Sequence, residues 1–278
     1  MIHKTLATRH QEAILRQRAG FGWLELGPDS TKTVIILHGI TGGKDDMLVL
    51  AEQYVALGHH VYCPDLPGHG DSAMIHVSEF ATLGRWLADF LKEIGVTPDI
   101  LIGNSFASAV IYSYMQQGML SPETHVILAC PTPRVALLSR LLNGAGQVVP
   151  LRFGWWAYNL PLAQRIRIWK LYRGDTTASY AWLVESEARK YSYIAPDVAP
   201  KLSSILFRDN PYDLSPLPQS IQRRTTVVLG DRDNVVTPEA RLYLKSILPR
   251  ARFLSAGSAG HILHFEAAGT MITHEPLE

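Results

Sequence analysis

A serine in a G-x-S-x-A sequence is the first residue of this chain whose type and setting suggest covalent chemistry. Residues 99–107 read Asp-Ile-Leu-Ile-Gly-Asn-Ser-Phe-Ala, so an apolar strand would run directly into Ser105 and then into a helix. Such a turn projects the hydroxyl but brings strand and helix close together, which requires small residues two positions to either side. Gly103 and Ala107 meet that requirement. The segment therefore predicts a nucleophile elbow, with a serine that only caps the helix as the alternative interpretation.

A serine hydroxyl becomes a useful nucleophile at neutral pH only with a base beside it and a group that orients the base. Two later loops supply candidates for both roles. Asp231 and Asp233 follow one apolar strand candidate, and His261 follows the next, with His264 shortly after it on the following helix. The carboxyl ends of parallel strands meet at one sheet edge, so these loops would lie near the serine. We predict His261 as the base rather than His264, with one of the two aspartates as its partner.

A glycine-rich loop early in the chain is a candidate for stabilising negative charge. Residues 38–43 read His-Gly-Ile-Thr-Gly-Gly and follow an apolar strand candidate. Backbone N–H groups aimed at the oxygen of a tetrahedral intermediate form an oxyanion hole, and we predict the amides of Ile40 and Phe106 for this role. The loop does not match the phosphate-binding pattern GxxxxGK[ST], because His38 and Asp45 stand where that pattern requires Gly and Ser or Thr. Nucleotide binding is therefore not expected.

Short runs rich in Val and Ile alternate with stretches of helical period, a pattern typical of an α/β protein with a mainly parallel sheet. The strand candidates are Thr33–Leu37, His60–Cys63, Asp99–Ile102, His125–Ala129, Thr225–Leu229 and Arg252–Leu254. The helix candidates are Asp45–Leu57, Val77–Ile94, Ser105–Gln117 and Pro238–Leu248. Ala13–Arg18 and Phe21–Leu26 would form an antiparallel hairpin at the sheet edge.

The strand rhythm stops between residues 131 and 222, which predicts a separate, mostly helical insertion. Prolines divide it into short pieces, and it holds four of the six tryptophans of the chain. We expect residues 131–222 to form a helical cap, or lid, on a core built from residues 1–130 and 223–278.

Three segments of the predicted cap have side chains suited to packing or binding. Residues 137–142 place four leucines on one helix face, and residues 164–173 interleave apolar with basic side chains. The candidates for lining an apolar acyl pocket are Trp155, Trp156 and Trp182, although such residues more often form the core of the cap itself. The basic residues of the cap are expected to be a solvated face.

Composition excludes several classes of function. The chain has 278 residues, 47% of them apolar, and a net charge of +1 from 26 basic and 25 acidic residues, typical of a soluble globular protein. No field over the whole surface would gather nucleic acid or an anionic bilayer. No apolar run approaches the roughly 20 residues of a transmembrane helix, and the start Met-Ile-His-Lys lacks the apolar region of a secretion signal. We expect a cytoplasmic protein, with its oligomeric state left open.

Metal and cofactor sites are not expected either. The two cysteines, Cys63 and Cys130, lie within or at the end of apolar runs and have no spacing suited to zinc or to a disulfide framework. Asp65, His69 and Asp71 lie close together, but Pro-Gly-His-Gly is typical of a turn and no second histidine is near. We interpret that cluster as structural.

Four motifs together resemble the α/β-hydrolase family, in particular its cap-bearing esterase and lysophospholipase branch. They are the His38-Gly39 loop, the sequence Asp-Leu-Pro-Gly-His-Gly-Asp-Ser at residues 65–72, the Ser105 elbow and the paired aspartate and histidine loops in the chain order Ser, Asp, His. The resemblance implies an eight-stranded sheet with helices on both faces and a cap after the sixth strand. It also implies that Asp233 rather than Asp231 is the triad acid. Ala107 departs from the usual glycine, and the chain ends soon after His261, which leaves only a short last helix.

The resulting hypothesis is a serine hydrolase that cleaves an ester or thioester with an apolar acyl part and needs no cofactor. A carbon–carbon bond hydrolase of ring-cleavage products is the alternative within the enzymes, because Gly-Asn-Ser at the elbow is frequent in those relatives. The loop at residues 38–43 lacks the Gly-Pro-Gly run expected for them. A non-catalytic ligand-binding receptor is the alternative from another class, since fold does not fix function.

Overall fold

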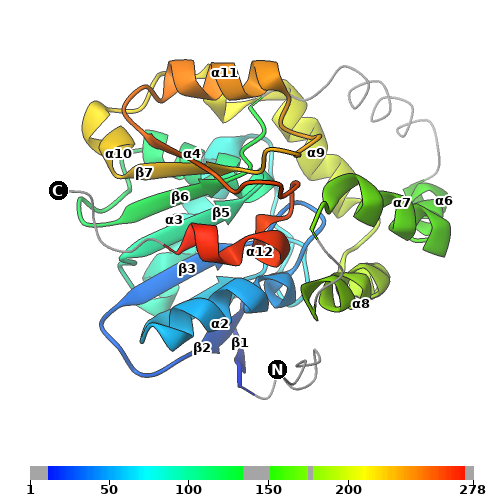
Figure 1. Cartoon of the computed structure of the whole chain (residues 1–278). Coiled ribbons are helices and arrows are strands. Elements are labelled where there is room, and N and C mark those ends of the chain that lie inside the picture. Colours follow the sequence, from blue (N-terminus) through cyan, green and yellow to red (C-terminus); the bar gives the residue numbers. More distant parts are fainter. Residues whose placement is uncertain (1–11, 134–150, 175–177, 273–278) are drawn as a thin grey trace.

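One sheet of eight strands, ordered β1-β2-β4-β3-β5-β6-β7-β8, forms the centre of the molecule (Figure 1). The computed structural model describes residues 12–133, 151–174 and 178–272. The strands are β1 (Ile14–Arg18), β2 (Phe21–Leu26), β3 (Thr33–Leu37), β4 (His60–Pro64), β5 (Ile100–Asn104), β6 (His125–Ala129), β7 (Thr225–Leu229) and β8 (Arg252–Ser255). β2 pairs antiparallel with β1 and β4, and the remaining neighbours are parallel.

Helices cover both faces of this sheet, which explains why its central strands read as continuous apolar runs. β3, β5 and β7 are buried along their whole length. Figure 1 shows α2 and α12 on one face and α3 and α4 on the other. The helical elements of this part are η1 (Lys44–Met47), α2 (Leu48–Ala56), α3 (Phe80–Ile94), α4 (Phe106–Gln116), α10 (Gln219–Arg223), α11 (Pro238–Ile247), α12 (Leu263–Glu266) and η3 (Ala268–Met271).

Further helices lie between β6 and β7, in the sequence interval where an insertion is predicted. They are α6 (Leu151–Tyr158), α7 (Pro161–Leu171), α8 (Ala178–Tyr193), α9 (Val198–Arg208) and the short η2 (Pro211–Asp213). In Figure 1, α6 and α7 project at one end of the molecule, away from the strands. The leucine-rich segment at residues 137–142 lies outside the described residues. Among the described helices, none has both the length and the apolar composition that crossing a bilayer requires.

The predicted α/β class and the eight-stranded sheet are confirmed, including the hairpin formed by β1 and β2. Several predicted element ends differ from the structure by one to three residues. The helix expected from Asp45 is a 3-10 turn, η1, that continues into α2, α3 begins at Phe80, and β5 extends as far as Asn104. The last difference matters for function, because the extra residues bring the strand to the position directly before Ser105.

Gly103 illustrates how tightly strand and helix approach at this point. A Cβ atom built on Gly103 would lie 2.7 Å from Cδ1 of Ile111 and 2.8 Å from the carbonyl oxygen of Ala107. Real side chains do not approach backbone so closely, so a larger residue would push α4 away from β5.

We therefore expect Gly103→Ala to lower the free energy of unfolding by about 1–3 kcal/mol. Gly269→Ala is the matched control, because the nearest atom to a Cβ at Gly269 lies 4.0 Å away; it should change stability by less than about 0.5 kcal/mol. Urea unfolding measures both, and equal effects would contradict the close-packing argument.

Candidate active site

Ser105 occupies a strained turn between β5 and α4. Its φ of 53° and ψ of −112° lie in a region that side-chain-bearing residues rarely adopt, at a typical cost of about 1–3 kcal/mol. Hydrogen bonds hold the turn in place: the Ser105 amide donates to Ala129 O at 2.8 Å, and the Ser108 hydroxyl donates to Gly103 O at 2.7 Å. A serine that only caps a helix would need neither this strained backbone nor these hydrogen bonds.

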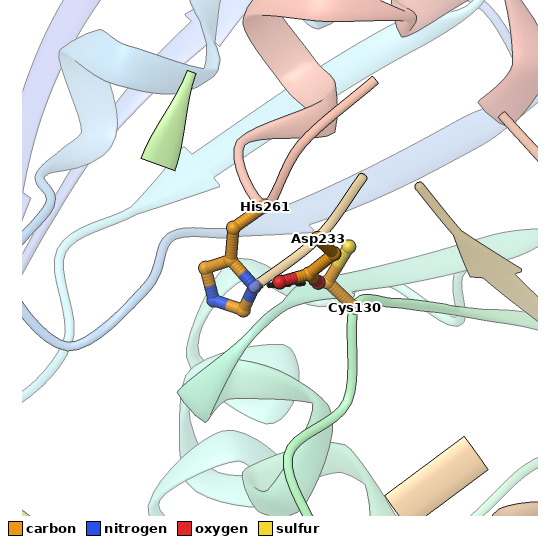
Figure 2. A group of neighbouring side chains, drawn as sticks. All are labelled: Cys130, Asp233 and His261. Carbon is orange, nitrogen blue, oxygen red and sulfur yellow. Dashed lines mark hydrogen bonds and ion pairs between the residues drawn. The ribbon is translucent and has the colours of Figure 1, made fainter. Parts of the chain in front are cut away.

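The structure brings Ser105, His261 and Asp233 together from three different loops. Nε2 of His261 lies 2.8 Å from Oγ of Ser105, and Nδ1 of His261 lies 2.8 Å from Oδ2 of Asp233. The carboxylate and the imidazole are both buried. Figure 2 shows the second of these contacts, with the Asp233 carboxylate pointing at the imidazole ring.

The carboxylate decides which nitrogen of His261 carries the proton. Burial alone would raise the pKa of Asp233, but His261 and the backbone amide of Val235 outweigh burial and lower the pKa to about 2. Oδ1 accepts from the amides of Val235 and Val236 at 2.7 and 3.1 Å. An ionised carboxylate only accepts hydrogen bonds, so Nδ1–H of His261 donates to it. The lone pair of Nε2 then faces the Ser105 hydroxyl.

The loops that carry Asp233 and His261 pack directly on each other. A Cβ on Gly230 would lie 2.2 Å from the carbonyl oxygen of Gly260, so only glycine fits there. The amide of His261 donates to Leu171 O at 2.8 Å, which links the histidine loop to the end of α7. The position of the imidazole is therefore set from both the sheet and the helices between β6 and β7.

Asp231 and His264, the sequence alternatives to Asp233 and His261, form no hydrogen bond with Ser105 within the described part of the chain. Asp231 is exposed and accepts a hydrogen bond from the Ser255 hydroxyl at 2.8 Å. His264 is buried in α12, and its Nδ1 atom has no partner among the described residues. Burial, together with the nearby Lys190, lowers the pKa of His264 to about 3, so it stays neutral.

Cys130 lies against the acid of this group (Figure 2). It has a φ of 46° directly after β6, and its Sγ donates to Gly260 O at 3.8 Å. The ligand atoms of Cys130, Asp233 and His261 lie within 4.8 Å of one another, as in a metal site. However, burial and then Asp233 raise the pKa of the thiol well above its usual value. A thiol with a raised pKa stays protonated at neutral pH and can donate a hydrogen bond. The sequence pattern placed Cys130 only within or at the end of an apolar run and gave no sign of its contact with Asp233.

The glycine-rich loop after β3 lies against the elbow, since a Cβ on Gly39 would be 3.6 Å from Cβ of Ser105. His38 fixes the peptide that joins Gly39 and Ile40: its Nε2 accepts from the Leu66 amide at 2.9 Å, so its Nδ1–H donates to Gly39 O at 2.7 Å. The peptides are trans, and in a trans peptide C=O and N–H point in opposite directions. The Ile40 N–H therefore points away from His38.

Neighbouring side chains support the same loop. Nε2 of His69 lies 2.8 Å from Ile40 O. Burial, followed by His69, lowers the pKa of His38 to about 3, which keeps His38 neutral. Lys44 ties the loop to residues 65–72, because its ammonium lies 2.5 Å from Asp65 and 2.6 Å from Asp71. The aspartates beside His69 thus bind a lysine of the chain, in agreement with the structural interpretation of this cluster.

A cavity of about 400 Å³ opens beside Ser105 and His261. Its apolar lining comprises Ile40, Met47, Ile168, Leu171, Leu183, Val235, Ile262 and Phe265, and its polar lining includes Asp46, Lys170, Ser186, Glu187, Lys190 and His264. Helices α7 and α8 therefore form much of the wall.

The three predicted tryptophans are not among the residues that line this cavity. Trp155 is buried and stacks on Tyr158 with ring centroids 5.3 Å apart, Trp156 is half exposed, and Trp182 is buried. Tyr158 and Leu183, on the same helices, line the cavity instead. The composition indicated the right helices, but only packing decides which face of each helix turns inward.

The polar part of the cavity wall is a buried ionic network that sequence reasoning missed. The Ser186 hydroxyl donates to Asp46, and Glu187 lies between Lys190 and Arg167, with Arg167 at 2.8 Å. Burial raises the pKa of Asp46 to about 6, although Lys190 and the Ser186 hydrogen bond oppose this. The network joins α8 to α7 and to η1. Its members are far apart in the sequence, so no local sequence motif could have predicted it.

Comparisons with known proteins give a consistent result. The family profile of the alpha/beta hydrolase fold matches residues 32–268. Lipase 1 of Psychrobacter immobilis is 23% identical over 272 residues, which cover 88% of this chain and 76% of the lipase. The solved structure of an esterase from Exiguobacterium antarcticum has a TM-score of 0.70 at 14% identity, covering 91% of each chain. That of 2-hydroxy-6-oxo-6-phenylhexa-2,4-dienoate hydrolase from a Rhodococcus species has a TM-score of 0.69 at 18% identity, covering 94% and 96%.

The raised pKa of Asp46 predicts a pH dependence of stability. Because the pKa rises from 3.8 to about 6 on folding, the protonated carboxyl stabilises the fold below pH about 4, and this contribution is lost as the pH rises through about 6. Asp46→Asn stays neutral throughout. The free energy of unfolding of Asp46→Asn minus that of the wild type should therefore increase by about 3 kcal/mol between pH about 4 and pH about 7.5. Denaturant unfolding across this range measures the difference, and a constant difference would contradict the shift.

Proposed function

The chain belongs to the α/β-hydrolase family, and from this premise we propose that it is a serine hydrolase that cleaves carboxylic esters with Ser105, His261 and Asp233. The observation that carries the proposal is the pair of 2.8 Å contacts that link Ser105 to His261 and His261 to Asp233. Membership of the family alone would not support this proposal, because the same fold also occurs in proteins that do not catalyse this reaction. The names of the lipase and esterase relatives favour the ester as the substrate class.

The proposed reaction begins with attack of the Ser105 oxygen on the ester carbonyl carbon, while Nε2 of His261 accepts the hydroxyl proton. Asp233 stabilises the imidazolium that forms and keeps its ring in position. As the carbonyl re-forms, the bond to the leaving alcohol breaks and the alcohol takes the proton from His261. A water molecule then attacks the acyl-serine by the same route, releasing the acid and restoring Ser105.

The developing negative charge on the carbonyl oxygen needs fixed donors. We assign this role to the amides of Ile40 and Phe106, the first residue of α4. His38 supports the assignment because its bond to Gly39 O turns the Ile40 N–H away from its own ring. Loss of one such donor typically lowers the rate by about 10²- to 10³-fold.

The substrate pocket proposed here is the cavity beside Ser105. Its apolar wall of eight side chains suits an alkyl or acyl chain. We propose that residues 131–222 act as a cap over a core of residues 1–130 and 223–278, because α7 and α8 contribute to this wall. A thioester fits the same mechanism, with a thiolate as the leaving group.

Carbon–carbon bond hydrolysis is a second candidate for the same residues. Gly-Asn-Ser at the elbow and the similar fold of the Rhodococcus dienoate hydrolase favour it, whereas the loop at residues 38–43 lacks the Gly-Pro-Gly run expected for it. Parallel assays with p-nitrophenyl esters and a coloured dienoic diketone separate the two reactions.

Ser105→Ala should lower the turnover of short p-nitrophenyl esters by at least about 10³-fold, because alanine has no oxygen to form the acyl-enzyme at this position. A fluorophosphonate probe followed by mass spectrometry should place the adduct on Ser105 in the wild type and find none in the variant. Full turnover by the variant would refute the mechanism. An unlabelled wild-type protein that still binds ligand would favour a receptor.

Two substitutions of His38 test the oxyanion assignment. Asn places an N–H close to the position of Nδ1 and can still donate to Gly39 O, whereas Gln extends to the position of Nε2 and cannot. We expect His38→Gln to lower kcat by about 10²-fold with a smaller change in KM, and His38→Asn to retain more of the rate. Thermal unfolding of both variants controls for loss of the fold. Equal losses would show that the bond to Gly39 does not matter for catalysis.

A further inference from the structure

Helix α7 exposes an apolar stripe that the proposed chemistry does not use. Leu162, Ile166 and Trp169 are 70%, 54% and 70% exposed. They are spaced four and three residues apart, so they lie on one face of the helix. Trp156, on the neighbouring α6, is also half exposed. Large apolar side chains gathered on one surface, rather than scattered singly, mark an interaction site. We call Leu162, Ile166 and Trp169 the α7 stripe.

The stripe is not the core-facing side of the helix. Ile168 and Leu171 of α7 line the cavity beside Ser105, and Ile168 is buried. α7 therefore has two apolar faces, one toward the cavity and one toward the outside. The exposed fractions of the stripe side chains show that the outer face is accessible, and α6 and α7 project at one end of the molecule in Figure 1.

Basic side chains accompany the stripe. Between Pro161 and Arg173 the chain has four basic residues and no acidic one. Arg167 is paired with Glu187, but Arg165 and Lys170 are exposed. The Arg173 guanidinium lies 5.2 Å from the centre of the Trp169 ring and donates to Trp169 O at 2.7 Å. The whole chain has a net charge of only +1, but positive charge is concentrated locally on and after α7.

We propose that the α7 stripe docks on an anionic lipid bilayer. Leucine, isoleucine and tryptophan side chains on one helix face insert into the boundary between headgroups and acyl chains, where tryptophan is especially favoured. Arg165 and Lys170 are placed to meet anionic headgroups, which attract cationic side chains near a membrane surface. A protein partner with a matching apolar groove would not by itself require this excess of positive charge.

Docking in this orientation gives the cavity a route to lipid. Lys170 belongs both to the basic residues beside the stripe and to the cavity lining, and Leu171 follows it on the inner side. Because the stripe and the cavity lie on opposite faces of α7, an apolar acyl chain would pass from the bilayer to the cavity around the edge of the helix that carries Lys170. This last step rests on the proposed function, whereas the docking itself does not.

Vesicle sedimentation of the full chain tests the proposal. The wild type should sediment with vesicles of phosphatidylcholine containing phosphatidylglycerol, and more weakly with phosphatidylcholine alone or at high salt. The triple variant Leu162→Ser, Ile166→Ser, Trp169→Ser should bind the mixed vesicles at least about ten-fold more weakly. Arg165→Gln should weaken binding by about five-fold.

The matched control replaces exposed leucines outside α7. Leu214 and Leu242 are 57% and 69% exposed, and Leu214→Ser with Leu242→Ser should leave vesicle binding unchanged. Ser105→Ala should bind as the wild type does, which separates docking from hydrolysis. Absence of wild-type binding, equal binding by the stripe variant, or equal binding to both vesicle types would overturn the proposal. The proposal would also be overturned if the wild type did not bind vesicles but self-associated, and if the stripe variant lost this self-association. The stripe would then be a contact with a second copy of the chain.

Discussion

The candidate site depends on one interaction, the hydrogen bond from His261 to a buried carboxylate that stays ionised. A charge removed from water is tolerated only where other groups compensate for it. Asp233 has three donors for this purpose, the imidazole and the amides of Val235 and Val236. The close packing of Gly230 on Gly260 keeps those donors and the imidazole at the right separation. The geometry at Ser105 follows, because the orientation of the imidazole determines where its free nitrogen points.

The same principle recurs around the glycine-rich loop. Lys44 is buried, yet its charge is balanced by Asp65 and Asp71, and the neutral His38 holds the loop peptide through a hydrogen bond rather than a charge. Breaking one partner of a buried pair leaves the other uncompensated, so such loops resist displacement. The strained backbone of Ser105 can persist because the segments beside it are fixed by such contacts. These segments are the glycine-rich loop and the loops that carry Asp233 and His261.

The sequence was sufficient to predict the features that local patterns encode. The strand candidates before Ser105, Asp233 and His261 are strands of one sheet, and their carboxyl ends converge because parallel strands share an edge. Features created by packing between distant segments could not be predicted. The ionic network of Asp46, Glu187 and Lys190 joins residues from η1 and α8. The positions of α6 and α8 that face the cavity belong to Tyr158 and Leu183 rather than to the tryptophans. Cys130 approaches Asp233 only because β6 ends beside the aspartate loop.

The hydrogen bond between the His261 amide and the last turn of α7 has a mechanical consequence. Leu171, the acceptor, is also the residue at which α7 ends. If α7 tilts or slides, this bond must either break or carry the histidine backbone with it. His261, the candidate base, and the helix beside the cavity are therefore mechanically coupled: a displacement of α7 would also shift the imidazole relative to Ser105.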